Sequence, residues 1–138
     1  MLDHQLMLSE SISVPFSIPD AFGGFGTAEG ILHYEKETLR LELAPKLLGF
    51  IDSGLKERSI PIQEIIQADF KTGWTHRTLT LRAKSLRTFD GITGTRQGKL
   101  ELAIEKSDVQ NAEHLSTMLN AHLTTQQLDR IQDDLNAL

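Results

Sequence analysis

The chain contains no cysteine, so it has no disulfide framework, no thiolate metal ligand and no cysteine nucleophile. It also lacks an apolar run of about 18 residues, the length that a membrane-spanning helix needs. Residues 1–11 carry no Lys or Arg and no continuous apolar block, which argues against a secretory signal. With 138 residues and 39% hydrophobic content, the chain is long enough for one core. We therefore expect one cytoplasmic domain.

Positive charge is scarce at both ends of the sequence. The formal net charge is −5, which argues against nucleic acid as a partner. Residues 1–34 contain four acids and no Lys or Arg, residues 35–107 have a small basic excess, and residues 108–138 contain five acids against Arg130 alone. This distribution is either ordinary solvated surface or a sign that the ends of one subunit meet the middle of another.

Motifs for catalysis or cofactor binding are also missing. The glycine-rich stretch from Gly24 to Gly30 has one residue too many for a dinucleotide fingerprint, and a strand follows it. The stretch Gly94–Lys99 resembles the end of a phosphate-binding loop but leads into a strand, so no helix N-terminus faces the anion. No two histidines are four residues apart, and no G-x-S-x-G motif occurs. We expect no enzyme activity, no cofactor and no metal.

Alternation of apolar and polar residues predicts about seven short strands joined by turns. The expected segments are residues 31–34, 38–44, 47–51, 58–62, 64–71, 76–83, 86–89 and 99–106. Residues 11–18 contain a proline and are expected at most as an extended edge segment, because proline is excluded from central strands. The strands predict an antiparallel sandwich or barrel.

The spacing of apolar residues changes after residue 106. Ser107 and Gln110 match a capping box. Val109, Ala112, Leu115, Leu119 and Leu123 then follow at helical spacing. Strands followed by such a helix predict an α+β domain in which the helix covers an open end of the sheet.

A second helical stripe comprises Leu128, Ile131, Leu135 and Leu138. On an unbroken helix it would lie about 140° around from the first stripe. Either the chain breaks near residues 124–125, where Thr124 and Gln127 form a second capping box and start a short helix that folds back on its own domain, or the stripe faces something else, such as another subunit.

Three segments carry a resemblance to a known family: RSIPIQEIIQADF (residues 58–70), THRTLTLRA (residues 75–83) and GKLELAIEKSDVQNAEHLSTML (residues 98–119). Together they resemble the pleckstrin-homology (PH-like) fold, in particular small bacterial PH-like domains, over residues 26–123. The resemblance implies a barrel of about seven antiparallel strands closed by a C-terminal amphipathic helix. The expected divisions are an N-terminal extension (1–24), the PH-like domain (25–123) and a helical tail (124–138).

Many PH domains bind phosphoinositides through basic residues on the first hairpin. The positions that match here are Lys36, Arg40 and Glu42, so the last basic position is an acid, and Glu35 and Glu37 flank the lysine. Carboxylates at this place would repel a phosphorylated headgroup. The sequence therefore argues against phosphoinositide binding at this hairpin.

The remaining candidate for binding is the stretch KTGWTHR, with Lys71, Trp74, His76 and Arg77 in an expected hairpin loop. An exposed Trp beside cations could contact a membrane interface or a partner protein. The alternative is a Trp that folds back over the mouth of the barrel.

We expect a binding or assembly module that forms a homo-oligomer through Leu128, Ile131, Leu135 and Leu138. A protein or peptide partner could also add a strand to an open sheet edge. The alternative function is peripheral binding to anionic phospholipid through the basic loops.

Overall fold

The computed structural model describes residues 11–24, 26–47, 50–51 and 56–138. The strands are β1 (Ile12–Ala21), β2 (Gly26–Glu35), β3 (Thr38–Leu47), β4 (Phe50–Ile51), β5 (Lys56–Pro61), β6 (Ile65–Thr72), β7 (Arg77–Ala83) and β8 (Lys99–Ala103). Short 3₁₀ helices are η1 (Phe22–Gly24), η2 (Ile62–Glu64) and η3 (Lys106–Asp108), and the last element is α2 (Val109–Asn136). The expected α+β class is confirmed.

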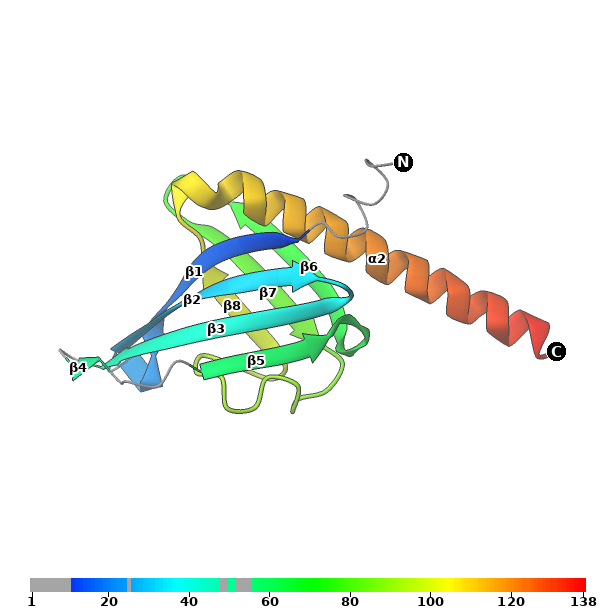
Figure 1. Ribbon diagram of the computed structural model, residues 1–138, viewed down its shortest axis with the longest axis horizontal. Helices are drawn as coiled ribbons and strands as arrows, with labels where there is room; N and C mark the ends of the chain where they lie inside the picture. Colours follow the sequence, from blue (N-terminus) through cyan, green and yellow to red (C-terminus); the bar gives the residue numbers. More distant parts are fainter. Residues whose placement is uncertain (1–10, 25, 48–49, 52–55) are drawn as a thin grey trace.

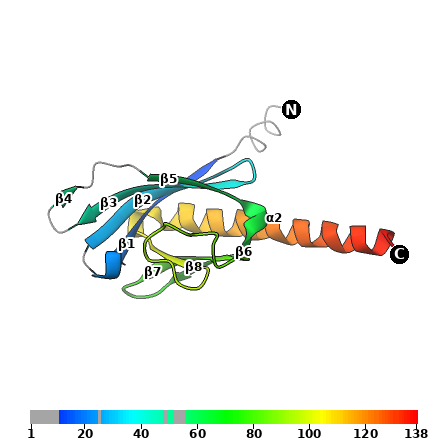
Figure 2. The same cartoon turned by 90° about the horizontal axis from the view of Figure 1, so that it is seen from below.

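All strand pairs are antiparallel and form one sheet in the order β4-β3-β2-β1-β8-β7-β6, with β5 also paired to β3. The sheet curls, so that the half made of β6, β7 and β8 faces the half made of β1, β2, β3 and β5 (Figures 1 and 2). Within the described residues β5 does not pair with β6, so the expected closed barrel is wrong. η2 connects these two strands across the opening.

The expected boundary at residue 24, between an N-terminal extension and the domain, is wrong because of strand β1. β1 pairs with β2 along its length and with β8 at Ser17, so it is an internal strand of the sheet and not part of an extension. It contains Pro15 and Pro19, two residues on either side of Ser17. The β1–β8 ladder covers only this one position between them, which explains how prolines, which lack an N–H, occur in an internal strand.

The glycine-rich stretch links β1 to β2. Gly23 and Gly24 have φ angles of 69° and 93°, which glycine adopts without steric cost. Gly30 has a different role inside β2, where it pairs with Phe16. A side chain at Gly30 would overlap with the ring of Phe16 and with the carbonyl oxygen of Glu42 in β3. The stretch is therefore a turn followed by a close-packed strand position.

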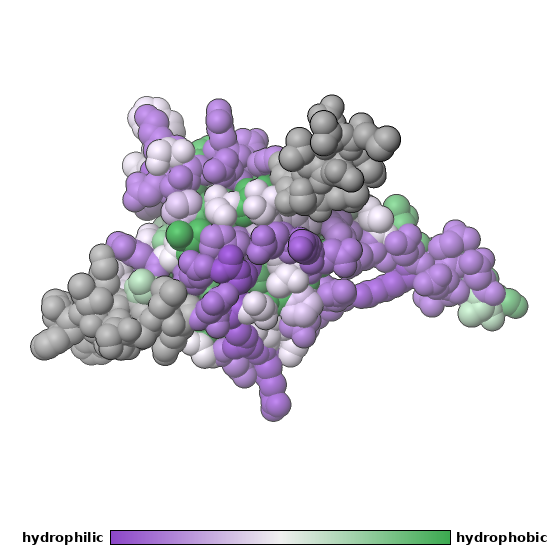
Figure 3. All heavy atoms as spheres, in the orientation of Figure 1, coloured by the Kyte–Doolittle hydropathy of each residue, from purple (hydrophilic) through white to green (hydrophobic). Residues whose placement is uncertain are grey.

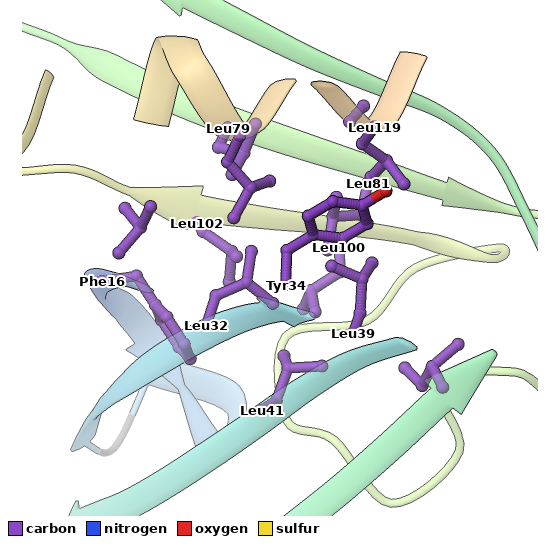
Figure 4. Packing of buried hydrophobic residues seen from close by; sticks show 14 of the residues in the cluster. Phe16, Leu32, Tyr34, Leu39, Leu41, Leu79, Leu81, Leu100, Leu102 and Leu119 are labelled. Carbon is purple, nitrogen blue, oxygen red and sulfur yellow. The ribbon is translucent and has the colours of Figure 1, made fainter. Parts of the chain in front are cut away.

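The core fills the space between the two halves of the sheet. Figure 4 shows Leu32, Leu39 and Leu41 pointing toward Leu79 and Leu100 from the opposite half. The sequence predicts this inward alternation for β3, β7 and β8.

The segment 84–98 also contributes to the core. Residues 86–89, expected as a strand, instead form turns in which Asp90 N–H donates to the Arg87 carbonyl at 3.0 Å. The side chain of Phe89 is fully buried. Arg58 of β5 fixes the segment by donating to the Thr88 carbonyl at 3.0 Å. The strand prediction is wrong because these residues form a loop that fills one opening of the sheet.

Helix α2 packs mainly against β6 and β1 through Ala112, Leu115, Ser116, Leu119 and Leu123. Its side chains also satisfy the backbone of β6, an edge strand. The Asn120 side chain accepts a hydrogen bond from Ala68 N–H at 3.1 Å and donates to the Ala68 carbonyl at 2.6 Å. Ser116 donates to the same carbonyl at 3.1 Å. Asn120 thus replaces a neighbouring strand at this position and blocks strand addition there.

Both capping boxes are wrong. The helix is capped at Asp108 without a side-chain hydrogen bond, and Ser107 lies in η3. Thr124 and Thr125 lie inside α2, where their hydroxyls donate to the Asn120 and Ala121 carbonyls at 2.9 and 3.1 Å. A threonine that bonds four residues back does not start a new helix. The tail therefore continues α2, and Figure 1 shows it projecting past the edge of the sheet.

Candidate functional site

The β6–β7 hairpin carries the binding residues that the sequence predicts. Gly73 N–H donates to the His76 carbonyl at 2.7 Å and closes the loop. Trp74, at the tip, is 102% exposed. The interpretation in which Trp74 folds over the mouth of the barrel is therefore wrong.

The cations of this hairpin do not form one group. The Lys71 side chain is 82% exposed, with its Nζ 3.7 Å from Asp69 Oδ2. Arg77 is partly buried, and its Nε donates to the Ile104 carbonyl at 3.1 Å. Lys71 and His76 line the outer surface of the sheet, whereas Arg77 ties β7 to the segment after β8.

The outer face of β6, β7 and β8 is hollowed over a volume of about 420 Å³. Its lining residues are Asp69, Lys71, Thr72, Gly73, His76, Thr78, Thr80, Arg82, Lys99 and Glu101. Strand alternation creates this polar surface, because Leu79 and Leu81 point into the core and the residues on either side of them along β7 point outward. The sequence shows the alternation, but only the strand pairing brings the three polar rows together.

The assembly residues form an exposed stripe on the projecting part of α2, with Leu138 two residues past the end of the helix. Leu128, Ile131, Leu135 and Leu138 are 61%, 55%, 59% and 102% exposed. Figure 3 shows apolar surface among the hydrophilic residues of this projecting end. The stripe contributes nothing to the core of its own chain, which ends along α2 at Leu123. It is therefore available for a contact outside the domain.

A polar chain across β1, β2 and β3 was missed in the sequence. Ser13 Oγ lies 2.7 Å from His33 Nδ1, and His33 Nε2 lies 3.3 Å from Glu42 Oε1. Arg40 donates to Glu42 and lies 3.3 Å from Glu57. The Arg40 hydrogen bond holds the pKa of Glu42 below its usual value, and Glu42 raises the pKa of Arg40.

Ser13, His33 and Glu42 are the residue types of a nucleophile, a base and an acid, but their surroundings differ from those of a catalytic site. Neither Ser13 nor His33 lines the hollow on β6–β8 or the smaller one between β5 and residues 90–92. The acid is also engaged by Arg40. We interpret this row of polar side chains as a structural network that links three neighbouring strands.

Another polar group lies where the tail leaves the body. Tyr34 Oη is 3.2 Å from His122 Nδ1, and His122 Nε2 is 3.5 Å from Glu37 Oε1. Burial raises the pKa of Tyr34, and the negative charge of Glu37 raises it further. Glu37 and Lys36 form the β2–β3 turn with positive φ angles. Ile62 N–H supports this turn by donating to the Glu37 carbonyl at 3.1 Å.

Lys36, Arg40 and Glu42, which the sequence places on the first hairpin, lie on the second hairpin of the sheet. Lys36 lies in the β2–β3 turn, and Arg40 and Glu42 lie in β3. The first hairpin is β1–β2, and it contains no Lys or Arg in its described residues. The described residues of this first hairpin therefore offer no cation to a phosphorylated headgroup.

Among the described residues, no cluster of three His, Asp or Glu side chains could hold a metal ion. No described helix is long and apolar enough to cross a bilayer.

Comparison with protein-family models, with curated proteins and with solved structures finds no match to this chain.

Proposed function

We propose that the chain is a non-enzymatic binding and assembly module of PH-like architecture. Two features support the PH-like interpretation. One half of the curled sheet contains β1, β2, β3 and β5, and the other contains β6, β7 and β8. A C-terminal helix then packs across the open side, against β6 and β1. The proposal for its function is that the tail of α2 associates with the tail of a second copy.

The observation that carries this proposal is the exposed apolar stripe on a helix that projects from its own domain. Its spacing alternates three and four residues from Leu128 to Leu138, as in the seam of a coiled coil. Such a seam is complementary to itself, so the same stripe on a second chain is its natural partner. The stripe extends over less than two heptads, so we expect weak, concentration-dependent association.

The test replaces Leu128, Ile131 and Leu135 with Gln in the full chain and measures sedimentation velocity from about 10 µM to about 1 mM. These side chains make no core contact, so the variant is expected to fold. The wild type should move from monomer toward dimer, and the variant should stay monomeric.

The matched control is Leu86→Gln, which replaces an exposed leucine outside the tail. It should associate like the wild type. A wild type that stays monomeric over the whole range, or a triple variant that associates equally well, would contradict the assembly proposal.

Trp74 favours a second candidate function, contact with an anionic membrane. An exposed Trp beside Lys71 is suited to the polar boundary of a bilayer. Trp74 is the only Trp of the chain, so its fluorescence reports directly on the hairpin. Vesicles containing phosphatidylglycerol should shift its emission to shorter wavelength, and added salt should reverse the shift. Unchanged emission with these vesicles would rule out this candidate.

A further inference from the structure

The outer face of β7 presents a row of polar side chains in the hollow of about 420 Å³ described above. The row comprises Thr78, Thr80 and Arg82 of β7 and His76 just before the strand, each two residues from the next along the chain. Strands β6 and β8 form its two walls. The row is therefore the floor of a groove that is polar along its whole length.

Each of the two walls pairs its own cation with its own acid. On β6, Lys71 Nζ lies 3.7 Å from Asp69 Oδ2, and on β8, Lys99 Nζ lies 3.0 Å from Glu101 Oε1. Asp69 and Glu101 are the cross-strand partners of Thr80. Each wall thus contributes one cation and one acid at short range, and neither leaves a net charge in the groove.

Arg82 on the floor differs from these wall residues. Within the part of the chain that the structure describes, its guanidinium has no hydrogen bond and no ion pair. Its cross-strand partner on β8, Lys99, is itself a cation. The hydroxyls of Thr78 and Thr80 also have no partner there. The groove therefore holds one uncompensated positive charge with two hydroxyls next to it on the same strand face.

We propose that this groove binds a small oxyanion, a phosphate or carboxylate group, with Arg82 as its anchor. A guanidinium presents paired N–H groups that match two oxygens of such an anion. The Thr80 hydroxyl, one outward position away, can donate a further hydrogen bond. A cationic ligand is disfavoured because both acids already have a lysine within 4 Å. This site is separate from the tail and does not rest on self-association.

The site is open to solvent, so its affinity should be modest. A single arginine with hydroxyl support should give a Kd in the millimolar range for inorganic phosphate. Loss of the guanidinium should weaken binding about tenfold. Arg82→Lys keeps the charge but loses the paired donors, so it should bind between the wild type and Arg82→Gln.

The experiment titrates the ¹⁵N-labelled full chain with sodium phosphate at constant pH and ionic strength, using chloride to balance. Saturable shifts of the backbone amides of residues 78–82 are expected, about tenfold weaker in Arg82→Gln. The control is Arg87→Gln, an exposed arginine in the segment between β7 and β8. It should bind phosphate like the wild type, and the amide spectrum of each variant verifies its fold.

A parallel arm replaces free phosphate with phosphatidylglycerol vesicles, which carry the same group on a lipid. Phosphate binding that depends on Arg82 supports the proposal, whether or not vesicles also bind. Shifts that do not saturate, or equal affinity in wild type and Arg82→Gln, overturn it. Vesicle binding without phosphate binding also overturns it, because the interaction then belongs to a membrane surface and not to an anion site.

Discussion

Tyr34, His122 and Glu37 connect the β2–β3 hairpin to α2 at the point where the tail leaves the body. Leu123, the next residue, is the last buried side chain of the helix. The three polar residues therefore hold the base of the projecting tail. Their contact joins residues 88 positions apart, so no local pattern in the sequence indicates it. Alone, His122 and Glu37 look like ordinary polar surface, and Tyr34 looks like the end of an expected strand.

The ionisation of Tyr34 should be detectable on its own, because it is the only tyrosine of the chain. Its pKa is raised above 10.0 by burial first and by Glu37 second. Because the folded pKa is raised, its stabilising contribution is complete below the unfolded pKa and is lost as the pH rises through the folded pKa. Absorbance of the phenolate near 295 nm should therefore rise at a higher pH in the folded chain than in urea.

Glu37→Gln separates the two causes. It should lower the pKa of Tyr34 only in part, because burial is the larger cause and remains. Glu35→Gln, at the other end of the same turn, serves as the control and should leave the titration unchanged. Equal phenolate titration curves for the folded and unfolded wild type would contradict the burial of Tyr34.

At the scale of elements, α2 is one continuous helix whose two halves have different surroundings. Its first half packs on β6 and β1, and its last turns project away from the body. The sequence predicts both apolar stripes, but it leaves open whether the chain breaks between them. Thr124 and Thr125 suggested a break because threonine favours helix starts. In the structure their hydroxyls bond within the helix, so the helix continues.

Asn120 should be the most important polar residue of α2 for stability. Asn120→Ala leaves the N–H of Ala68 without its partner and removes one of two donors to the Ala68 carbonyl. The cost should be about 1–3 kcal/mol in the free energy of unfolding, measured by urea denaturation. Gln127→Ala, an exposed position on the same helix, should change it by less than about 0.5 kcal/mol. Equal stability of Asn120→Ala and the wild type would contradict the role of Asn120 at the β6 edge.

At the scale of the whole molecule, two surfaces of opposite character lie on different parts of the chain. The tail around Leu128 and Leu135 carries three acids, Asp129, Asp133 and Asp134, against Arg130. The groove on the outer face of β7 holds Arg82, which has no hydrogen bond or ion pair to any residue that the structure describes. Tail–tail contact brings like charges together, whereas anion binding brings opposite charges together.

Salt should therefore change the two interactions in opposite directions. Raising NaCl from about 0.05 to about 0.5 M screens the repulsion between tails and should strengthen dimerisation in sedimentation velocity. The same change should weaken phosphate binding in the amide titration. Dimerisation that weakens with salt would instead indicate that acidic ends meet the basic middle of another subunit.

The sequence by itself determined the fold class, most of the strands and the two stripes of α2. These features depend on local periodicity, since the alternation in β3, β6, β7 and β8 and the helical spacing after residue 106 are visible without knowing what packs against them. It also placed Trp74 in a hairpin loop, because Gly73 and the flanking strand patterns mark a turn.

Only the tertiary structure decided which residues meet across the sheet. β1 was not recognised as an internal strand because its prolines break the local pattern, and they are tolerated only through the short β1–β8 ladder. Phe89 was assigned to a strand because burial in a loop leaves no periodic signal. Strand register likewise placed Arg82 between the walls of a groove and Asn120 at the edge of β6. These placements depend on long-range pairing, which local periodicity does not encode.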